Sequence, residues 1–222
     1  MDLAVQVPDW KDFDRICLSL MEEGYAKTDL VHRLSSPQGV PLDIIPFGPI
    51  ESENSTIAWP PAGDFKLGVM GFQEALENAD IVVVDQAPTL ELAVASPQGL
   101  VLLKLIAWSE RDARDRRKDA TDILYLLSNH ENINGMMDQL YNQHEAVLEA
   151  YDWDTRLSGA HVLGLKVSGV ANASTLSFLE NLLDEDRIAN LERDAGSDID
   201  NMAGEVLAAF FEGLFSRRKS GA

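Results

Sequence analysis

Cysteine and positive charge are both scarce in this sequence, and long hydrophobic runs are missing from it. Cys17 is the only cysteine among 222 residues, which excludes an internal disulfide and any cysteine-rich zinc site. Lys and Arg number 18 against 37 Asp and Glu, and the net charge of -19 opposes nonspecific adhesion to nucleic acid or anionic membranes. The apolar run from Leu100 to Trp108 is interrupted by Lys104 and is shorter than the ~20 residues of a membrane helix. We therefore expect a cytoplasmic protein with no membrane partner, whose contacts with nucleic acid are at most local.

The first half of the sequence mixes strand and helix signals. A β-branched run after Asp2 predicts a strand, and apolar residues at helical spacing predict a helix that ends at Gly24. Turn residues between short apolar segments predict two hairpins in a mixed sheet, and a segment rich in Pro, Gly and Ser predicts a long loop. The predicted elements are a helix from residue 10, a hairpin of strands 30–34 and 40–47, a loop over 48–71, a short helix at 72–78, and a hairpin of strands 81–84 and 90–94.

From Ser96 onward the apolar period becomes helical, with Ser96 as N-cap and Pro97 in the first turn. The predicted class is α+β: a mixed sheet with flanking helices, followed by a C-terminal helical region. We expect an α/β core over residues 1–95, a helical domain over 96–216 and a disordered tail over 217–222. The predicted helices are 96–109, 118–128, 133–149, 154–165, 174–183, 186–195 and 200–215.

An acidic residue, Asp43, lies inside a segment that otherwise predicts a buried strand. Burying a carboxylate costs several kcal/mol unless a cation or hydrogen-bond donors meet it, so Asp43 needs a partner. Asp2 precedes another predicted strand, and two acids on neighbouring strands could hold magnesium, which takes oxygen ligands and keeps waters and substrate phosphates in its shell. The alternative is an ion pair with an arginine such as Arg33, and both interpretations stay open.

A second group of charged residues lies on two successive predicted helices. Lys104 and Arg111 are seven residues apart and share one helical face, so both cations could point toward a triphosphate. Asp119 and Asp122, one turn apart on the next helix, could orient these cations. The alternative is a solvated helix followed by a charged surface loop.

The remaining polar candidates favour structural roles. The four histidines show no metal-binding spacing. Arg33 is a candidate phosphate contact, but a cross-strand ion pair explains it at least as well. Gly159 and Gly164, on a predicted helix, indicate close helix packing rather than ligand binding.

Several segments, taken together, resemble one known family. The similarity extends over nearly the whole chain and joins strand, loop and helix motifs. The segments are Asp2-Leu3-Ala4-Val5, Pro41-Leu42-Asp43-Ile44-Ile45-Pro46-Phe47-Gly48, Ile57-Ala58-Trp59-Pro60-Pro61, residues 99–108, and residues 118–127 with Lys118-Asp119-Ala120-Thr121-Asp122. In these segments the chain resembles the AbiEii/AbiGii group of nucleotidyltransferase toxins, within the DNA polymerase β-like nucleotidyltransferase superfamily.

The resemblance implies roles for individual residues. The metal site of this family has three acids, two in a D-x-D strand and one on a later strand. By this resemblance Asp2 corresponds to the second of these acids and Asp43 to the third. Lys104 matches the lysine that holds nucleotide phosphates, and magnesium is the implied metal. The first acid and a glycine- or serine-rich turn belong before Asp2, where the sequence has only Met1, so we expect an N-terminally incomplete core.

The resemblance also implies a function: metal-dependent transfer of a nucleotide from a nucleoside triphosphate to an acceptor hydroxyl. In this family the acceptor can be RNA, and the enzyme can be the toxin of a toxin-antitoxin pair, with an antitoxin protein as partner. The alternative is a truncated, non-catalytic module that keeps the fold for binding or interaction. In a third interpretation Asp43 is a purely structural acid.

Overall fold

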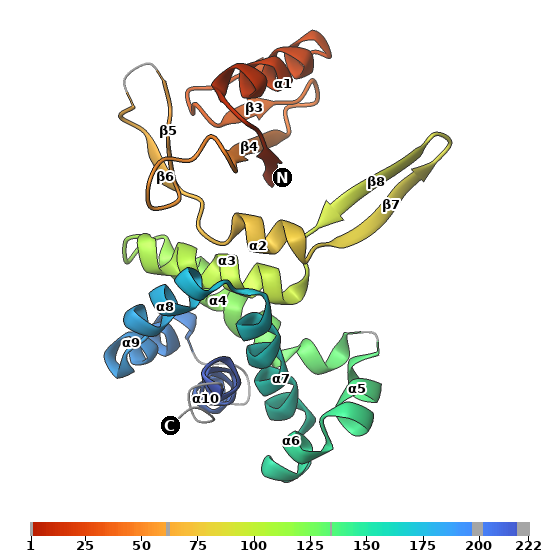
Figure 1. The fold of residues 1–222 in the computed structure, drawn as a ribbon, viewed down its shortest axis with the longest axis vertical. Coiled ribbons are helices and arrows are strands. Elements are labelled where there is room, and N and C mark those ends of the chain that lie inside the picture. The colour runs from red at the N-terminus through yellow and green to blue at the C-terminus, as the bar shows by residue number, and fades with distance from the viewer. Residues whose placement is uncertain (1, 61–62, 134, 197–201, 217–222) are drawn as a thin grey trace. The chain divides into compact units, whose positions relative to one another are not determined.

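The structure is a computed structural model that describes residues 2–60, 63–133, 135–196 and 202–216. The chain divides into two compact units, Met1–Gln73 and Glu74–Ala222, and Figure 1 shows the elements of each. The predicted domain limit at 95/96 marks the change from strands to helices, the limit at 216/217 marks the start of the expected tail, and both remain predictions. The tail expected to be disordered, 217–222, lies outside the described residues.

The first unit is built on a four-stranded mixed sheet. Strand β1 is parallel to β4, while β4 and β3, and β3 and β2, are antiparallel, giving the order β1-β4-β3-β2. The hairpin predicted on either side of residues 35–39 is confirmed. Its first strand covers residues 33–35 instead of the predicted 30–34. The elements are β1 (Asp2–Gln6), α1 (Trp10–Glu22), β2 (Ala26–Lys27), β3 (Arg33–Ser35) and β4 (Pro41–Phe47).

Helix α1 and alternate residues of β4 form the core of this unit. Asp9 caps α1 by accepting a hydrogen bond from the Asp12 backbone N–H at 3.0 Å. Because successive strand residues point to opposite faces, Leu42 and Ile44 are buried together while Asp43 lies on the other face. The core cluster is Val7, Phe13, Leu34, Leu42, Ile44, Phe47, Ile57, Trp59 and Val69.

The prediction of a long loop over 48–71 was wrong in part. Two short strands, β5 (Thr56–Ala58) and β6 (Lys66–Gly68), pair there in an antiparallel hairpin. Trp59, just after β5, is only 7% exposed, and its ring lies 5.3 Å from those of Trp10 and Phe65. Three-residue strands are too short to show an alternating pattern, and the surrounding Pro and Gly obscured the buried aromatic residues.

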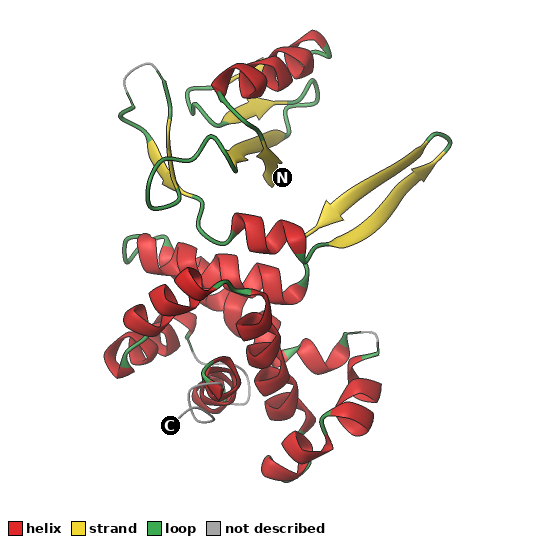
Figure 2. Ribbon diagram, in the orientation of Figure 1, coloured by secondary structure: helices red, strands yellow, loops and turns green. Residues whose placement is uncertain are grey.

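The second unit begins within helix α2 (Phe72–Glu77) and continues with the hairpin of β7 (Asp80–Gln86) and β8 (Thr89–Val94), which confirms the second predicted hairpin. The two strands make a sheet of their own. After them the described chain contains only helices (Figure 2). These are α3 (Pro97–Glu110), α4 (Arg116–Ser128), the 3-10 helix His130–Asn132, α5 (Met136–Gln143), α6 (Glu145–Ala150), α7 (Thr155–Val170), α8 (Ala173–Leu182), α9 (Glu185–Ala195) and α10 (Ala203–Leu214).

The predicted α+β class and most predicted helices are confirmed, but the helix expected over 133–149 is two helices. His144 interrupts it with φ -129° and ψ 30°, outside the helical range. The change of direction lets Leu140 of α5 and Leu148 of α6 share one buried cluster with Val162 of α7. None of the described helices is long and apolar enough to cross a membrane.

Helices α7 and α10 approach each other at glycines. A Cβ atom added at Gly164 would lie 2.1 Å from the Phe210 carbonyl oxygen, and one at Gly213 would lie 2.0 Å from the His161 carbonyl oxygen. Neither position has room for a side chain. The predicted packing role of Gly164 is confirmed, and a Cβ at Gly159 would meet the backbone nitrogen of Glu131 at 3.2 Å.

Candidate functional site

Three charged residues form a row across the sheet of the first unit. Asp2 on β1 is in register with Asp43 on β4, and Asp43 is in register with Arg33 on β3. Residues directly opposite on paired strands project from the same face of the sheet. The row therefore runs acid, acid, cation on the face opposite Leu42 and Ile44.

Arg33 holds both oxygens of the Asp43 carboxylate. Its Nε donates to Oδ1 at 2.5 Å and its Nη2 to Oδ2 at 2.7 Å, a bidentate pair. This hydrogen bonding lowers the pKa of Asp43, against the smaller opposing effect of burial, and raises that of Arg33. Asp43 thus has the partner that its strand position requires, and the partner is the arginine of the alternative interpretation.

The row offers a metal ion little beyond two carboxylates. Asp2 is exposed, and within the described residues no group of three or more His, Cys, Asp or Glu could hold a metal ion. Magnesium is commonly bound by one or two carboxylates together with substrate phosphates and water, so Asp2 and the free lone pairs of Asp43 fit one such ion. They do not fit a two-metal site held by protein ligands alone.

The second unit contains the other predicted group, on α3 and α4. The Lys104 Nζ donates to Asp119 Oδ1 at 3.1 Å and to Asp122 Oδ2 at 2.6 Å. The Arg111 Nη1 donates to the second oxygen of Asp119, Oδ2, at 2.5 Å. One carboxylate thereby joins both cations, and we call these four residues the lysine cluster.

Burial differs sharply within the lysine cluster. The Asp119 side chain is 1% exposed, whereas Asp122 is 41% and Arg111 49% exposed. Burial by itself lowers the pKa of Lys104, but the hydrogen bonds to Asp122 and Asp119 outweigh it, and the net shift is upward. Lys104 therefore keeps its charge at neutral pH, and both cations retain N–H donors for a phosphate.

The predicted site residues thus fall into two sets. Asp2 and Asp43 are neighbours in the first unit, and Lys104, Arg111, Asp119 and Asp122 are joined in the second. A third set, around His130 and Lys166, was not predicted; these two residues line a cavity of the second unit. An isolated histidine and an isolated lysine, 36 positions apart by their numbers, form no motif, so only the fold reveals them.

Comparison with known families identifies the chain. The family model described as nucleotidyl transferase AbiEii toxin, type IV TA system, matches residues 19–215, and the chain belongs to this family. The match includes Asp43 and the lysine cluster, while Asp2 lies before it. Neither a curated protein nor a solved structure matches the chain.

Proposed function

We propose that this protein is a metal-dependent nucleotidyltransferase that transfers a nucleotide from a nucleoside triphosphate to an acceptor hydroxyl, with RNA as acceptor, and acts as a toxin in the cytoplasm. Membership of the AbiEii toxin family is the observation that carries the proposal. In the reaction the acceptor oxygen bonds to the α-phosphorus, the bond to pyrophosphate breaks, and the hydroxyl proton goes to solvent. A type IV toxin-antitoxin system also includes an antitoxin.

The lysine cluster supplies the phosphate-binding part of the proposal. Asp119 fixes the orientation of Lys104 and Arg111 by ion pairs at 3.1 and 2.5 Å, so neither cation has to be ordered when a triphosphate arrives. Pre-ordered donors lower the entropy cost of binding. The exposed half of Arg111 leaves its guanidinium accessible to phosphate oxygens.

Asp2 and Asp43 supply the metal-binding part. They would hold one magnesium ion, which would neutralise phosphate charge and stabilise the attacking and leaving oxygens. Arg33 keeps the Asp43 carboxylate ionised and fixes its position on β4. Asp2 is the residue in register with Asp43 on the neighbouring strand.

The second candidate is a non-catalytic nucleotide-binding or interaction module of the same fold. The observation in its favour is that both oxygens of Asp43 already accept hydrogen bonds from Arg33 and that no third ligand adjoins the pair among the described residues. In this case the ion pair of Asp43 stabilises the fold, and the lysine cluster is a structural ion-pair network.

Calorimetric titration with each nucleoside triphosphate, with and without magnesium, tests the proposal. The wild-type chain is compared with Asp43→Asn, Lys104→Met and the exposed control Asp29→Asn. We expect magnesium-dependent binding that Asp43→Asn and Lys104→Met abolish and Asp29→Asn retains, followed by incorporation of labelled nucleotide into an RNA pool. If the folded wild-type chain binds no triphosphate, the proposal is wrong. If it binds without magnesium and transfers nothing, the second candidate is right.

A further inference from the structure

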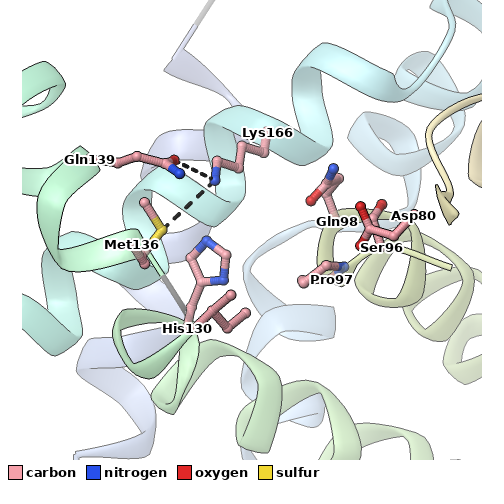
Figure 3. Close-up of a pocket in the computed structure, with 9 residues that line it drawn as sticks. Asp80, Ser96, Pro97, Gln98, His130, Met136, Gln139 and Lys166 are labelled. Carbon is pink, nitrogen blue, oxygen red and sulfur yellow. Dashed lines mark hydrogen bonds between the residues drawn. The ribbon is translucent and has the colours of Figure 1, made fainter. Parts of the chain in front are cut away.

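The second unit contains a partly open cavity of about 200 Å³ that none of the roles assigned above uses. It lies where the start of β7, the N-terminus of α3, the 3-10 helix, α5 and α7 meet. Figure 3 shows Lys166, Gln139 and Met136 on one side of the His130 ring, and Gln98, Pro97, Ser96 and Asp80 across from them. The lining is polar and apolar in about equal parts, and it includes a single acid, the exposed Asp80.

His130 is buried in the wall of this cavity without a hydrogen-bond partner. The residue is 1% exposed, and neither Nδ1 nor Nε2 has a partner within the described residues. Burial lowers its pKa to about 4, with Lys166 adding to the shift, so the ring is neutral and carries one N–H donor and one acceptor. Buried polar groups are nearly always paired, so such an imidazole indicates a partner that is not part of the chain.

Lys166 presents a positive charge with no acid to balance it. Its Nζ donates to Gln139 Oε1 at 3.1 Å and contacts Met136 Sδ at 3.8 Å, both of which are neutral groups. Among the described residues it forms no ion pair, although the chain has 37 acidic residues. Burial lowers the pKa of Lys166, which shows that its charge is partly desolvated.

The α3 N-terminus adds to the positive character of the cavity. Ser96 caps the helix by accepting from the Gly99 backbone N–H at 3.4 Å, and Pro97 takes the first helical position. A helix of 14 residues carries a partial positive charge at this end, where anions bind favourably. The Gln98 side chain, also in the lining, contributes amide donors.

Water alone would satisfy the hydrogen bonding of this cavity but not the charge in its wall. The space could hold several water molecules, and these would pair with the His130 ring. They would not balance the charge of Lys166, which a bound anion would. The volume is below the range of about 300–1,000 Å³ for pockets that take drug-sized ligands, so a whole nucleoside triphosphate is too large.

We propose that this cavity binds a small oxyanion, a phosphate or carboxylate group, with Lys166 as its charge partner and the His130 ring as a hydrogen-bond donor. The side-chain amide of Gln98 adds donors, and the α3 N-terminus adds its partial positive charge. The site is independent of the lysine cluster and of the proposed nucleotidyl transfer.

Histidine ring resonances of the wild-type chain provide the first test. The four histidines are labelled with ¹⁵N, and inorganic phosphate replaces chloride at constant ionic strength. We expect saturable shifts of the His130 ring signals, with His32, in the first unit, as an internal control that does not move. Unmoved His130 signals at millimolar phosphate, or equal shifts in all four rings, would overturn the proposal.

Variants provide the second test. Lys166→Met removes the charge but keeps a chain of similar length, and Lys27→Met removes an exposed lysine of the first unit as the matched control. We expect Lys166→Met to weaken phosphate binding about tenfold or more in calorimetry, while Lys27→Met leaves it unchanged. Lys104→Met should leave the phosphate-induced shifts of the His130 ring unchanged, which separates this site from the proposed triphosphate site. Equal affinity in Lys166→Met would contradict the assignment.

Discussion

Asp119 holds the lysine cluster together because it is the one buried residue among four charged side chains. Replacing it with Asn removes the charge that Lys104 and Arg111 share, and we expect a loss of roughly 1–3 kcal/mol of unfolding free energy. Asp122→Asn breaks only a partly exposed pair and should cost about 0–1 kcal/mol. Urea denaturation of the two variants beside the wild type measures both. Equal costs would mean that Asp119 is not the centre of the cluster.

His130 should make the stability of the protein depend on pH. Its pKa is about 4 in the folded chain against 6.5 for the ordinary group, so between these values the unfolded chain binds a proton that the folded chain does not. Stability is therefore lost as the pH falls. Between about pH 7 and pH 5.5 the loss from this residue is about 1 kcal/mol.

The measurement compares urea denaturation of the wild type and His130→Asn at both pH values in chloride buffer. The variant should lack this part of the pH dependence, while His32→Asn, in the first unit, should retain it. An identical pH dependence in the wild type and His130→Asn would show that the pKa of His130 is the same in the folded and the unfolded chain.

For single residues, the sequence predicted which charged side chains need a partner. It did not predict equally well which residue the partner is. An aspartate in an apolar strand had to meet a cation or a metal, and Asp43 meets Arg33. The choice depends on the strand register, which periodicity alone does not determine. Helical spacing predicts that Lys104 and Arg111 share one face of α3 and that Asp119 and Asp122 lie one turn apart on α4, whereas the contact between the two pairs depends on how α3 and α4 pack.

Among the helices, α7 and α10 depend on glycine for their contact. Gly164→Ala would place a Cβ 2.1 Å from the Phe210 carbonyl oxygen, and we expect a loss of roughly 1–3 kcal/mol or more. The matched control is Gly169→Ala on the same helix, where a Cβ meets nothing within 4 Å. This control should be neutral or stabilising by about 0.5–1 kcal/mol. Thermal unfolding of both variants measures the difference, and equal stability would show that the helices lie farther apart.

The hairpin β7–β8 should be less protected against hydrogen exchange than the long helices of the second unit. Its apolar side chains are exposed on both faces, from 42% at Val82 to 64% at Ile81, and an isolated two-stranded hairpin is only marginally stable in water. We expect its backbone amides to exchange with deuterium much faster than those of α3, whose Val101, Leu102 and Leu105 are fully buried. Mass-spectrometric hydrogen exchange measures this. Protection equal to that of α3 would mean that another surface covers the hairpin in solution.

Elements with clear signals were predicted, and those fixed by tertiary contacts were not. Helix α3 has an N-cap, a proline and a long apolar run, and it begins within one residue of the predicted start. The strands β5 and β6 form because Ile57 and Trp59 are buried, and the break at His144 forms because Leu140 and Leu148 share one cluster. Neither cause is visible in local sequence.

For the whole molecule, the net charge of -19 should govern encounters with polyanions. Nonspecific binding to RNA requires Lys and Arg to replace counterions, and acids outnumber them about two to one. We expect no measurable binding of random single-stranded RNA in fluorescence anisotropy at an ionic strength of about 0.15 M. Tight binding that weakens steeply with salt would instead reveal a local basic surface. An RNA acceptor would then be held by that surface rather than by the nucleotide site alone.

The glycine contact between α7 and α10 bears on how the chain folds as the ribosome makes it. Helix α7 is synthesised well before Phe210, whose carbonyl packs on Gly164, so this face of the nascent helix has no partner until α8, α9 and most of α10 have followed. The strands of the sheet β1-β4-β3-β2 all precede the second unit in the chain, and units that are made earlier generally fold first during synthesis. The row of Asp2, Asp43 and Arg33 thus forms early, while the second unit closes last and is the part of the newborn protein most exposed to chaperones and proteases.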